Sequence, residues 1–341
     1  MQTSGMKPYL WMLCGCGWFA AMVVIIGAAN HHVAWQTVAV FRAAIAAIFA
    51  TTLAVGTRAK LTFGTPILWL RSVSGSLSMV TSFYALTHLP GSDVLVITNS
   101  FPVWVALLSW PMFGERPTLG VIVAVLAAVG GVAVCNELKF SEFQPAHFAA
   151  IFASVFTAVA MMGLNRIKGV SSLGVVVHFS WVSVAFCSLT YFMPPKEGEV
   201  AKPFLPGEVL HWVELLAVGA TATFGQIFLT KAFRGGQATK VSVVGLSQVV
   251  MVMLWEGLVP KEWDWGGRDF SAWQLVGTVL VLGPTAYLMI RERKRVKAER
   301  DAQPTNSVAG AAATEQAENL QELSPGRASE GLGRGTSHPA A

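Results

Sequence analysis

The chain has 341 residues, of which 53% are hydrophobic and only 13% are charged, and its mean hydropathy is +0.54. This composition excludes an ordinary soluble globular domain, in which about a quarter of the residues are charged. The formal net charge of +5 could indicate a nucleic-acid partner, but the basic residues sort by their place between apolar segments. We therefore predict a multi-pass membrane protein that binds no nucleic acid.

Ten apolar segments follow one another along the chain, and most reach the roughly 20 residues that a helix needs to cross a bilayer. The first is a full span with no small-residue cleavage site after it, so it is not a cleaved signal peptide. Together the segments predict an all-α integral membrane fold of ten transmembrane helices. The predicted spans are 9–29, 34–55, 67–86, 92–113, 119–135, 146–164, 173–192, 209–230, 239–258 and 273–290.

The second half of the chain repeats the first half. A constant shift of 147 in residue number, here called the repeat offset, carries Ala85 to Ala232 and Ser100 to Ser247. Each copy holds five spans, and because five is odd the second copy enters the membrane from the opposite side. Such inverted five-helix repeats are typical of small secondary transporters. The predicted repeats cover 9–136 and 146–290.

The basic residues indicate how the spans are oriented. Cytoplasmic loops of membrane proteins carry an excess of Lys and Arg, so the richer side is predicted to be cytoplasmic. Both termini then lie in the cytoplasm, with 1–8 as a short N-terminus and 291–341 as a basic, then disordered, tail of an inner or plasma membrane protein. The predicted cytoplasmic residues are Lys7, Arg58, Lys60, Arg71, Arg116, Arg166, Lys168, Lys231, Arg234, Lys240 and the run 291–300.

One stretch of the first copy carries a family resemblance. The segment 85–93 (ALTHLPGSD), Pro102, the segment 114–116 (GER) and Gly130 together resemble the end of an EamA domain of the drug/metabolite transporter superfamily. The second copy is similar but has Val249 where the first has Pro102. The resemblance implies two five-helix bundles around a substrate cavity near the membrane midplane, and export more than uptake. The matching residues of the second copy are Ala232, Ala238, Glu262 and Gly277.

Polar residues inside spans predict where a substrate binds, because lipid offers them no partners. The third span carries a row of serines with Ser74 and Ser78 on one helical face, and the eighth span carries Thr221 and Gln226. These hydroxyls could line a cavity or could let helices pack closely.

The fourth span has a sharper signal. Asn99 and Ser100 stand directly before a phenylalanine and a proline, which interrupts a helix and frees backbone carbonyls. Interrupted helices often mark transporter binding sites, although the polar residues could simply satisfy a kink. Ser247 and Gln248 stand at the matching place in the ninth span. Trp104 could stack on a planar substrate or belong to the core.

Ionisable residues within spans are expensive and need a reason. Arg42 in the second span could hold an anionic substrate group or join a structural ion pair. His178, at a similar place in the seventh span, could carry a coupling proton or pack through a hydrogen bond. Arg71 and Glu115 are predicted to pair near the cytoplasmic ends of adjacent spans.

The sequence predicts no cofactor and no metal site, since its four cysteines form no CxxC pair. A membrane-embedded acyltransferase is the alternative function, because His88 and Asp93 match an HxxxxD pattern in which a carboxylate orients the imidazole. We favour a secondary-active or facilitative transporter of a small organic metabolite, without a catalytic residue. Protons are a candidate coupling ion, and the sequence predicts no oligomeric state.

Overall fold

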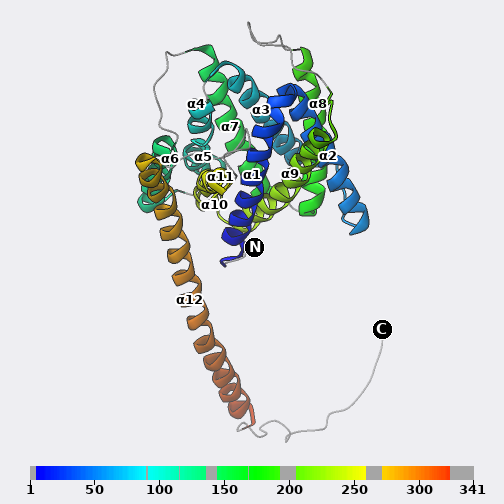
Figure 1. The fold of residues 1–341 in the computed structure, drawn as a ribbon. Helices are drawn as coiled ribbons and strands as arrows, with labels where there is room; N and C mark the ends of the chain where they lie inside the picture. The colour runs from blue at the N-terminus through cyan, green and yellow to red at the C-terminus, as the bar shows by residue number, and fades with distance from the viewer. Residues whose placement is uncertain are drawn as a thin grey trace, which may run out of the picture. The chain divides into compact units, whose positions relative to one another are not determined.

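The computed structural model describes residues 5–89, 91–114, 116–135, 144–167, 169–192, 205–258 and 271–322. Within these ranges the regular structure is entirely helical, which confirms the predicted all-α fold (Figure 1). The helices are α1 (Lys7–His32), α2 (Trp35–Gly56), α3 (Pro66–His88), α4 (Gly91–Thr98), α5 (Phe101–Phe113), α6 (Leu119–Cys135), α7 (Pro145–Arg166), α8 (Ser172–Ser188), the 3-10 helix η1 (Leu189–Phe192), α9 (Val209–Gly235), α10 (Ala238–Gly245), α11 (Ser247–Leu258) and α12 (Ala272–Glu322).

Each predicted span corresponds to one helix or to a pair of short helices. In the described part of the chain, eight segments are long and apolar enough to cross a membrane, two of them composed of α4 with α5 and of α10 with α11. Helix α6 is apolar but has only 17 residues. Helix α3 has 23 residues, but Arg71 and its row of serines lower its hydropathy.

The disorder of the tail after about residue 301 stays a prediction. Helix α12 is described through Glu322. Its last part is rich in Ala, Glu and Gln, which are strong helix formers. Residues 293–341 form a unit separate from the compact unit of residues 1–292.

Two spans are interrupted at matching places. Helix α4 ends at Thr98 and α5 begins at Phe101, while α10 ends at Gly245 and α11 begins at Ser247. The repeat offset carries Thr98 to Gly245, so the interruption recurs in register even though the second copy has no proline there. A thiol from α1 supports the second interruption, since Cys16 Sγ donates to the Gly245 carbonyl oxygen at 3.4 Å.

The two halves interlock rather than forming two separate bundles. Helix α1 packs along α9, α3 packs along α7, and α2 packs against α8, so the first and third helices of each half exchange partners (Figure 1). Glycine permits the closest approach between α1 and α9, because an added Cβ at Gly225 would lie 2.8 Å from Phe19. This interlocking places side chains from both halves around one central space.

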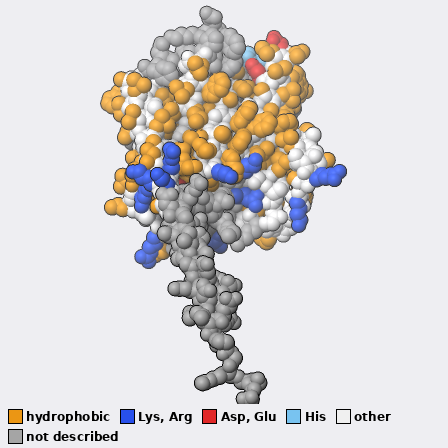
Figure 2. Space-filling model, turned by 90° about the horizontal axis from the view of Figure 1, so that it is seen from below, with side chains coloured by type: hydrophobic (Ala, Val, Ile, Leu, Met, Phe, Trp, Pro, Cys, Tyr) orange, Lys and Arg blue, Asp and Glu red, His pale blue; other side chains and the backbone are white. Residues whose placement is uncertain are grey.

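Polar contacts tie together helix ends that carry basic residues. Arg234 at the end of α9 donates to Ser172 at the start of α8 at 3.2 Å, and Lys240 in α10 pairs with Glu292 at 2.9 Å. Figure 2 shows Lys and Arg side chains gathered on the side of the molecule that it presents, beside broad hydrophobic surface. Basic side chains therefore share the side that Figure 2 presents, next to broad hydrophobic surface.

Candidate substrate-binding site

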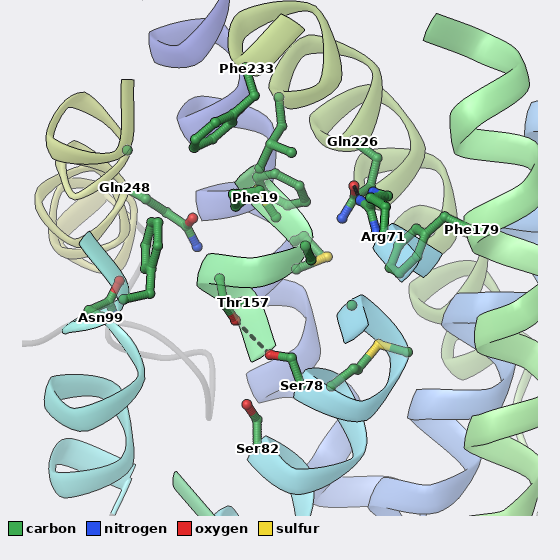
Figure 3. Close-up of a pocket in the computed structure, with 18 of the residues that line it drawn as sticks. Phe19, Arg71, Ser78, Ser82, Asn99, Thr157, Phe179, Gln226, Phe233 and Gln248 are labelled. Carbon is green, nitrogen blue, oxygen red and sulfur yellow. Dashed lines mark hydrogen bonds between the residues drawn. The ribbon is translucent and has the colours of Figure 1, made fainter. Parts of the chain in front are cut away.

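A cavity of about 320 Å³ lies between the two halves, beside both helix interruptions. Its volume falls within the range of small-molecule sites. Methionine and phenylalanine supply nine of its 21 lining residues, and eight others carry polar side chains (Figure 3). It consists of Met12, Phe19, Met22, Arg42, Arg71, Gly75, Ser78, Met79, Ser82, Phe83, Asn99, Phe101, Thr157, Ala160, Met161, Phe179, Gln226, Leu229, Phe233, Gly245 and Gln248.

Arg71 of α3 is the most deeply buried charge on this wall, with 1% of its surface exposed. Its Nη2 donates to Gln226 Oε1 at 3.1 Å, and its guanidinium carbon lies 4.0 Å from the centre of the Phe179 ring. The Nε and Nη1 atoms have no hydrogen-bond partner among the described residues. The guanidinium is thus held by an aromatic face and an amide while retaining free donors.

Arg42 of α2 lines the same cavity. Its Nε lies 3.2 Å from Met22 Sδ, and its Nη1 contacts Met79 Sδ. Thioether sulfur is only a weak acceptor, so these contacts do little to offset the charge. Among the described residues that line the cavity, none is Asp or Glu. This end of the cavity is therefore cationic.

The other end carries neutral amides at the two interruptions. Figure 3 shows Gln248 extending its amide toward the cavity, with Asn99 beside it and Phe19 between this pair and the Arg71–Gln226 end. Asn99 Nδ2 donates to the Leu95 carbonyl oxygen at 2.8 Å, so this side chain also supports the end of α4. The site has a cationic end, an apolar middle and an amide end.

Four of the nine residues predicted to bind substrate line this cavity, namely Ser78, Asn99, Gln226 and Gln248. Ser78 is already well bonded, because its Oγ donates to the Ala153 carbonyl oxygen at 2.9 Å and lies 2.6 Å from Thr157 Oγ1. We therefore expect the three amides to offer more to a ligand than this serine.

The other five predicted residues do not belong to the lining of this cavity, and their part in substrate binding stays a prediction. Ser100 and Thr221 donate to the carbonyl oxygens of Ile97 at 2.6 Å and Ala217 at 2.7 Å, so their hydroxyls bond their own helices. The remaining three pack among the helices, with Trp104 against the main core cluster: Ser74, Trp104 and Ser247. For these hydroxyls, the packing and self-bonding alternatives describe the structure.

His178 also lies off the cavity, and its neighbour Phe179 takes the lining position. Nδ1 of His178 and Ser72 Oγ share a 2.8 Å hydrogen bond. The Trp69 ring lies edge-on to the His178 imidazole, with 4.7 Å between the ring centres. One residue along a helix turns a side chain by about 100°, which separates the faces of His178 and Phe179. The packing alternative fits this histidine.

The predicted pair of Arg71 and Glu115 is placed differently. Arg71 lies on the cavity wall rather than at an exposed helix end, and its hydrogen-bond partner is Gln226. Glu115 lies outside the described residues. Arg71 is the sixth residue of α3 and is buried at the cavity, whereas Trp69 and Leu70 just before it are exposed.

Sequence reasoning missed most of the apolar wall. Phe179, Phe19 and Phe233 line the cavity, yet phenylalanine is common throughout the chain and signals nothing alone. The positions at which matching helices begin could have pointed to Phe19. Aligning the first residue of α1 with the first residue of α7 relates Phe19 to Thr157, so both members of a matched pair line the cavity.

Residues 6–136 match the model of the EamA-like transporter family. The part of the chain that this match covers is its first half. It holds α1 to α6, and therefore both arginines and the first interruption. For the second half, the recurrence of the interruption at the repeat offset remains the basis for a second EamA repeat.

Relatives of the EamA-like chain are named as transporters. The pseudopaline exporter CntI of Pseudomonas aeruginosa is 28% identical over 206 residues, covering 58% of this chain and 68% of the relative. Solute carrier family 35 member G1 of Mus musculus is 26% identical over 218 residues, covering 59% of this chain and 58% of the relative. The family and these relatives identify a membrane transporter.

A solved crystal structure has the same fold. It aligns with a TM-score of 0.68 over 86% of this chain and 99% of that chain, at 16% sequence identity. At this identity the likeness concerns the fold alone.

The acyltransferase alternative gains no support from these comparisons, which indicate a transporter and not an enzyme. His88 is exposed at the end of α3, and its Nδ1 donates to the Tyr84 carbonyl oxygen at 3.0 Å. It is not part of the cavity lining, and the Asp93 side chain lies outside what the structure describes.

Proposed function

We propose that this EamA-like protein moves a small organic metabolite across the membrane by alternating access. The observation that carries the proposal is one cavity lined from both halves, at the two matched helix interruptions. Interrupted helices at a repeat interface are where secondary transporters bind their substrates. Because the halves have opposite topology, rocking one against the other would open the same site to each side in turn.

The binding chemistry is divided among named side chains. The amides of Gln226, Gln248 and Asn99 supply hydrogen bonds, and Phe19 and Phe101 form apolar walls. A few placed polar groups in an apolar cavity are typical of small-molecule sites. The short turns at 99–100 and at 246 would act as hinges, because they can absorb backbone rotation without breaking helical hydrogen bonds.

Orientation and direction are part of the same proposal. We propose that the side carrying the basic helix ends faces the cytoplasm, with both termini on that side of an inner or plasma membrane; the basic residues Arg234 and Lys240 support this orientation. Export is the proposed direction, since one relative is named as an exporter. The energy comes from an ion gradient or from the metabolite's own concentration difference, and protons stay a candidate coupling ion.

Counterflow in proteoliposomes tests the proposal. Liposomes loaded with unlabelled amino acids, nucleosides or small organic acids should accumulate the labelled form of a true substrate, with and without an imposed pH gradient. Replacing Gln248 by Ala should reduce that flux roughly 2- to 12-fold, the loss expected for one hydrogen bond of 0.5–1.5 kcal/mol.

The matched control is Gln36→Ala, which removes an amide in the first turn of α2 that does not line the cavity. Membrane insertion and yield should be equal for both variants and the parent protein. Equal flux in Gln248→Ala and the parent would remove Gln248 from the binding site. Absence of counterflow for every tested metabolite by correctly folded protein would count against transport through this cavity.

A further inference from the structure

We propose that the substrate is a small organic anion whose carboxylate or phosphate group binds between Arg71 and Arg42, with its apolar body along the phenylalanine wall. This inference rests on the proposed transport function and names the substrate class for the same cavity. It depends on how the two charges are held, what surrounds them, and what the opposite end of the cavity offers.

The first argument is the uncompensated charge of Arg71. A buried cation costs several kcal/mol unless an anion and good hydrogen bonds offset it. Arg71 is 1% exposed, yet in the described part of the chain its guanidinium has only the neutral Gln226 amide as a hydrogen-bond partner and the Phe179 ring as a cation–π partner. Its Nε and Nη1 atoms are buried without a hydrogen-bond partner among the described residues. An incoming oxyanion would supply both the missing charge and the missing acceptors.

The second argument is that the Arg71 guanidinium is held in a shaped seat. An added Cβ at Gly75 would lie 2.6 Å from Arg71 Nη1 and 2.9 Å from the Phe179 ring, so only glycine leaves room there. Gly163 of α7 lies against the stem, where an added Cβ would be 3.4 Å from Arg71 Cβ. A side chain fixed by an aromatic face, an amide and two glycines is preorganised for a ligand.

The third argument is a second cation at the same end. Arg42 contacts the sulfur atoms of Met22 and Met79, which are weak acceptors. A smaller neighbouring cavity is lined by Arg42 together with Phe179 and Gln226, the two side chains that hold Arg71. Both guanidinium groups therefore border one region. The only ion pair among the described residues, between Lys240 and Glu292, lies away from it.

The rest of the cavity narrows the choice of anion. Figure 3 shows Phe19 between the arginine end and the Gln248–Asn99 end, so a bound molecule would run along an aromatic surface. An inorganic ion would leave that surface uncovered. The amide end favours a neutral hydrogen-bonding group and offers no acidic partner among its described lining residues for a cation. We infer an anion with an apolar middle and a neutral polar end.

Ligand-induced thermal stabilisation in lipid nanodiscs tests the inference without relying on transport. The probes are N-acetylphenylalanine, indole-3-acetate and hexanoate, each beside its carboxamide, together with phenyl phosphate. We expect at least one anion to raise the melting temperature, and its uncharged counterpart to do so far less. The stronger of carboxylate and phosphate then identifies the acidic group.

Three variants assign the effect to the cavity. Arg71→Gln should weaken anion binding roughly 10- to 100-fold, as expected for losing a charge-assisted hydrogen bond. Arg42→Met keeps a side chain suited to its methionine surroundings and should weaken the same binding even if Arg71→Gln folds poorly. Arg234→Gln is the matched control, because this arginine lies at the basic end of α9 outside the cavity and bonds Ser172.

The outcomes separate this inference from the transport proposal. Equal stabilisation by acids and their carboxamides, stabilisation by none of the anions, or unchanged anion binding in both cavity variants would overturn the anion site. Anion binding that depends on Arg71 and Arg42 supports it. Such binding without any counterflow of the same anion would support the anion site and count against transport. Counterflow of neutral metabolites alone would support transport and count against the anion site.

Discussion

The two halves of the molecule line the cavity from matching positions but with different chemistry. At the repeat offset, Met79 of α3 corresponds to Gln226 of α9, and Phe101 of α5 corresponds to Gln248 of α11. All four side chains line the cavity. In both pairs the first half supplies an apolar side chain and the second half supplies an amide.

At the charged positions the pattern is the opposite: the first half supplies the polar side chain and the second half supplies an apolar one. Aligning the first residue of α2 with the first residue of α8 relates Arg42 to Phe179. Arg71 corresponds to Val218 at the repeat offset, and Val218 is a buried core residue. Both cations thus come from the first half. Wall positions that match between the halves therefore carry different side chains, and the two ends of the cavity differ.

The largest effect is expected where the first half is made to resemble the second. Gly75 corresponds to Ala222 at the repeat offset. In Gly75→Ala the new methyl group would overlap Arg71 Nη1 and the Phe179 ring, so we expect the guanidinium to be displaced. Overpacking of this kind costs about 1–3 kcal/mol, which corresponds to roughly 5- to 150-fold weaker binding of a transported anion. Counterflow measures the loss of transport, and thermal melting in nanodiscs measures the loss of anion binding.

Gly130→Ala is the control for that change, since it adds the same methyl group within helix α6, where nothing lies within 4 Å of the added atom. It should leave flux unchanged. Parent-like anion binding by Gly75→Ala would show that the Arg71 seat does not depend on this glycine.

An intermediate effect is expected from exchanging the chemistry of one matched pair. Gln248→Phe removes the amide that extends toward the cavity, and Phe101→Gln places one on the facing interruption. We expect Gln248→Phe to weaken binding roughly 2- to 12-fold, and the double exchange to recover part of that loss. Concentration dependence of counterflow measures both. No recovery in the double variant would mean that the two ends are not interchangeable.

The smallest effect on transport is expected at His178. His178→Gln removes the imidazole that bonds Ser72, so stability should fall by about 1 kcal/mol while flux and its response to a pH gradient stay unchanged. Thermal unfolding beside counterflow separates the two, with Ser72→Ala as the partner variant. Loss of the pH response alone would instead make His178 a proton carrier.

Local features of the chain were predictable because they depend on neighbours in sequence. Apolar runs located a helix or helix pair at each predicted span, and eight of these are long and apolar enough to cross a membrane. Pro102 after Asn99 and Ser100 identified the first interruption. The structure adds a second interruption at 245–247, which has no proline and lies at the matching place in the second half. The row of serines in α3 was read less well, because a hydroxyl can bond its own helix, a neighbouring helix or a ligand.

The sequence by itself determined an all-helical membrane transporter with one interrupted span and polar residues near it. Only the tertiary structure decided that Arg71 lies on the cavity wall, that Phe179 rather than His178 faces it, and that the halves interlock. The physical reason is rotation and register. Which side of a helix meets the cavity depends on packing against helices far away in sequence. Because the loops differ in length, the shift in residue number from α1 to α7, and from α2 to α8, is also shorter than the repeat offset.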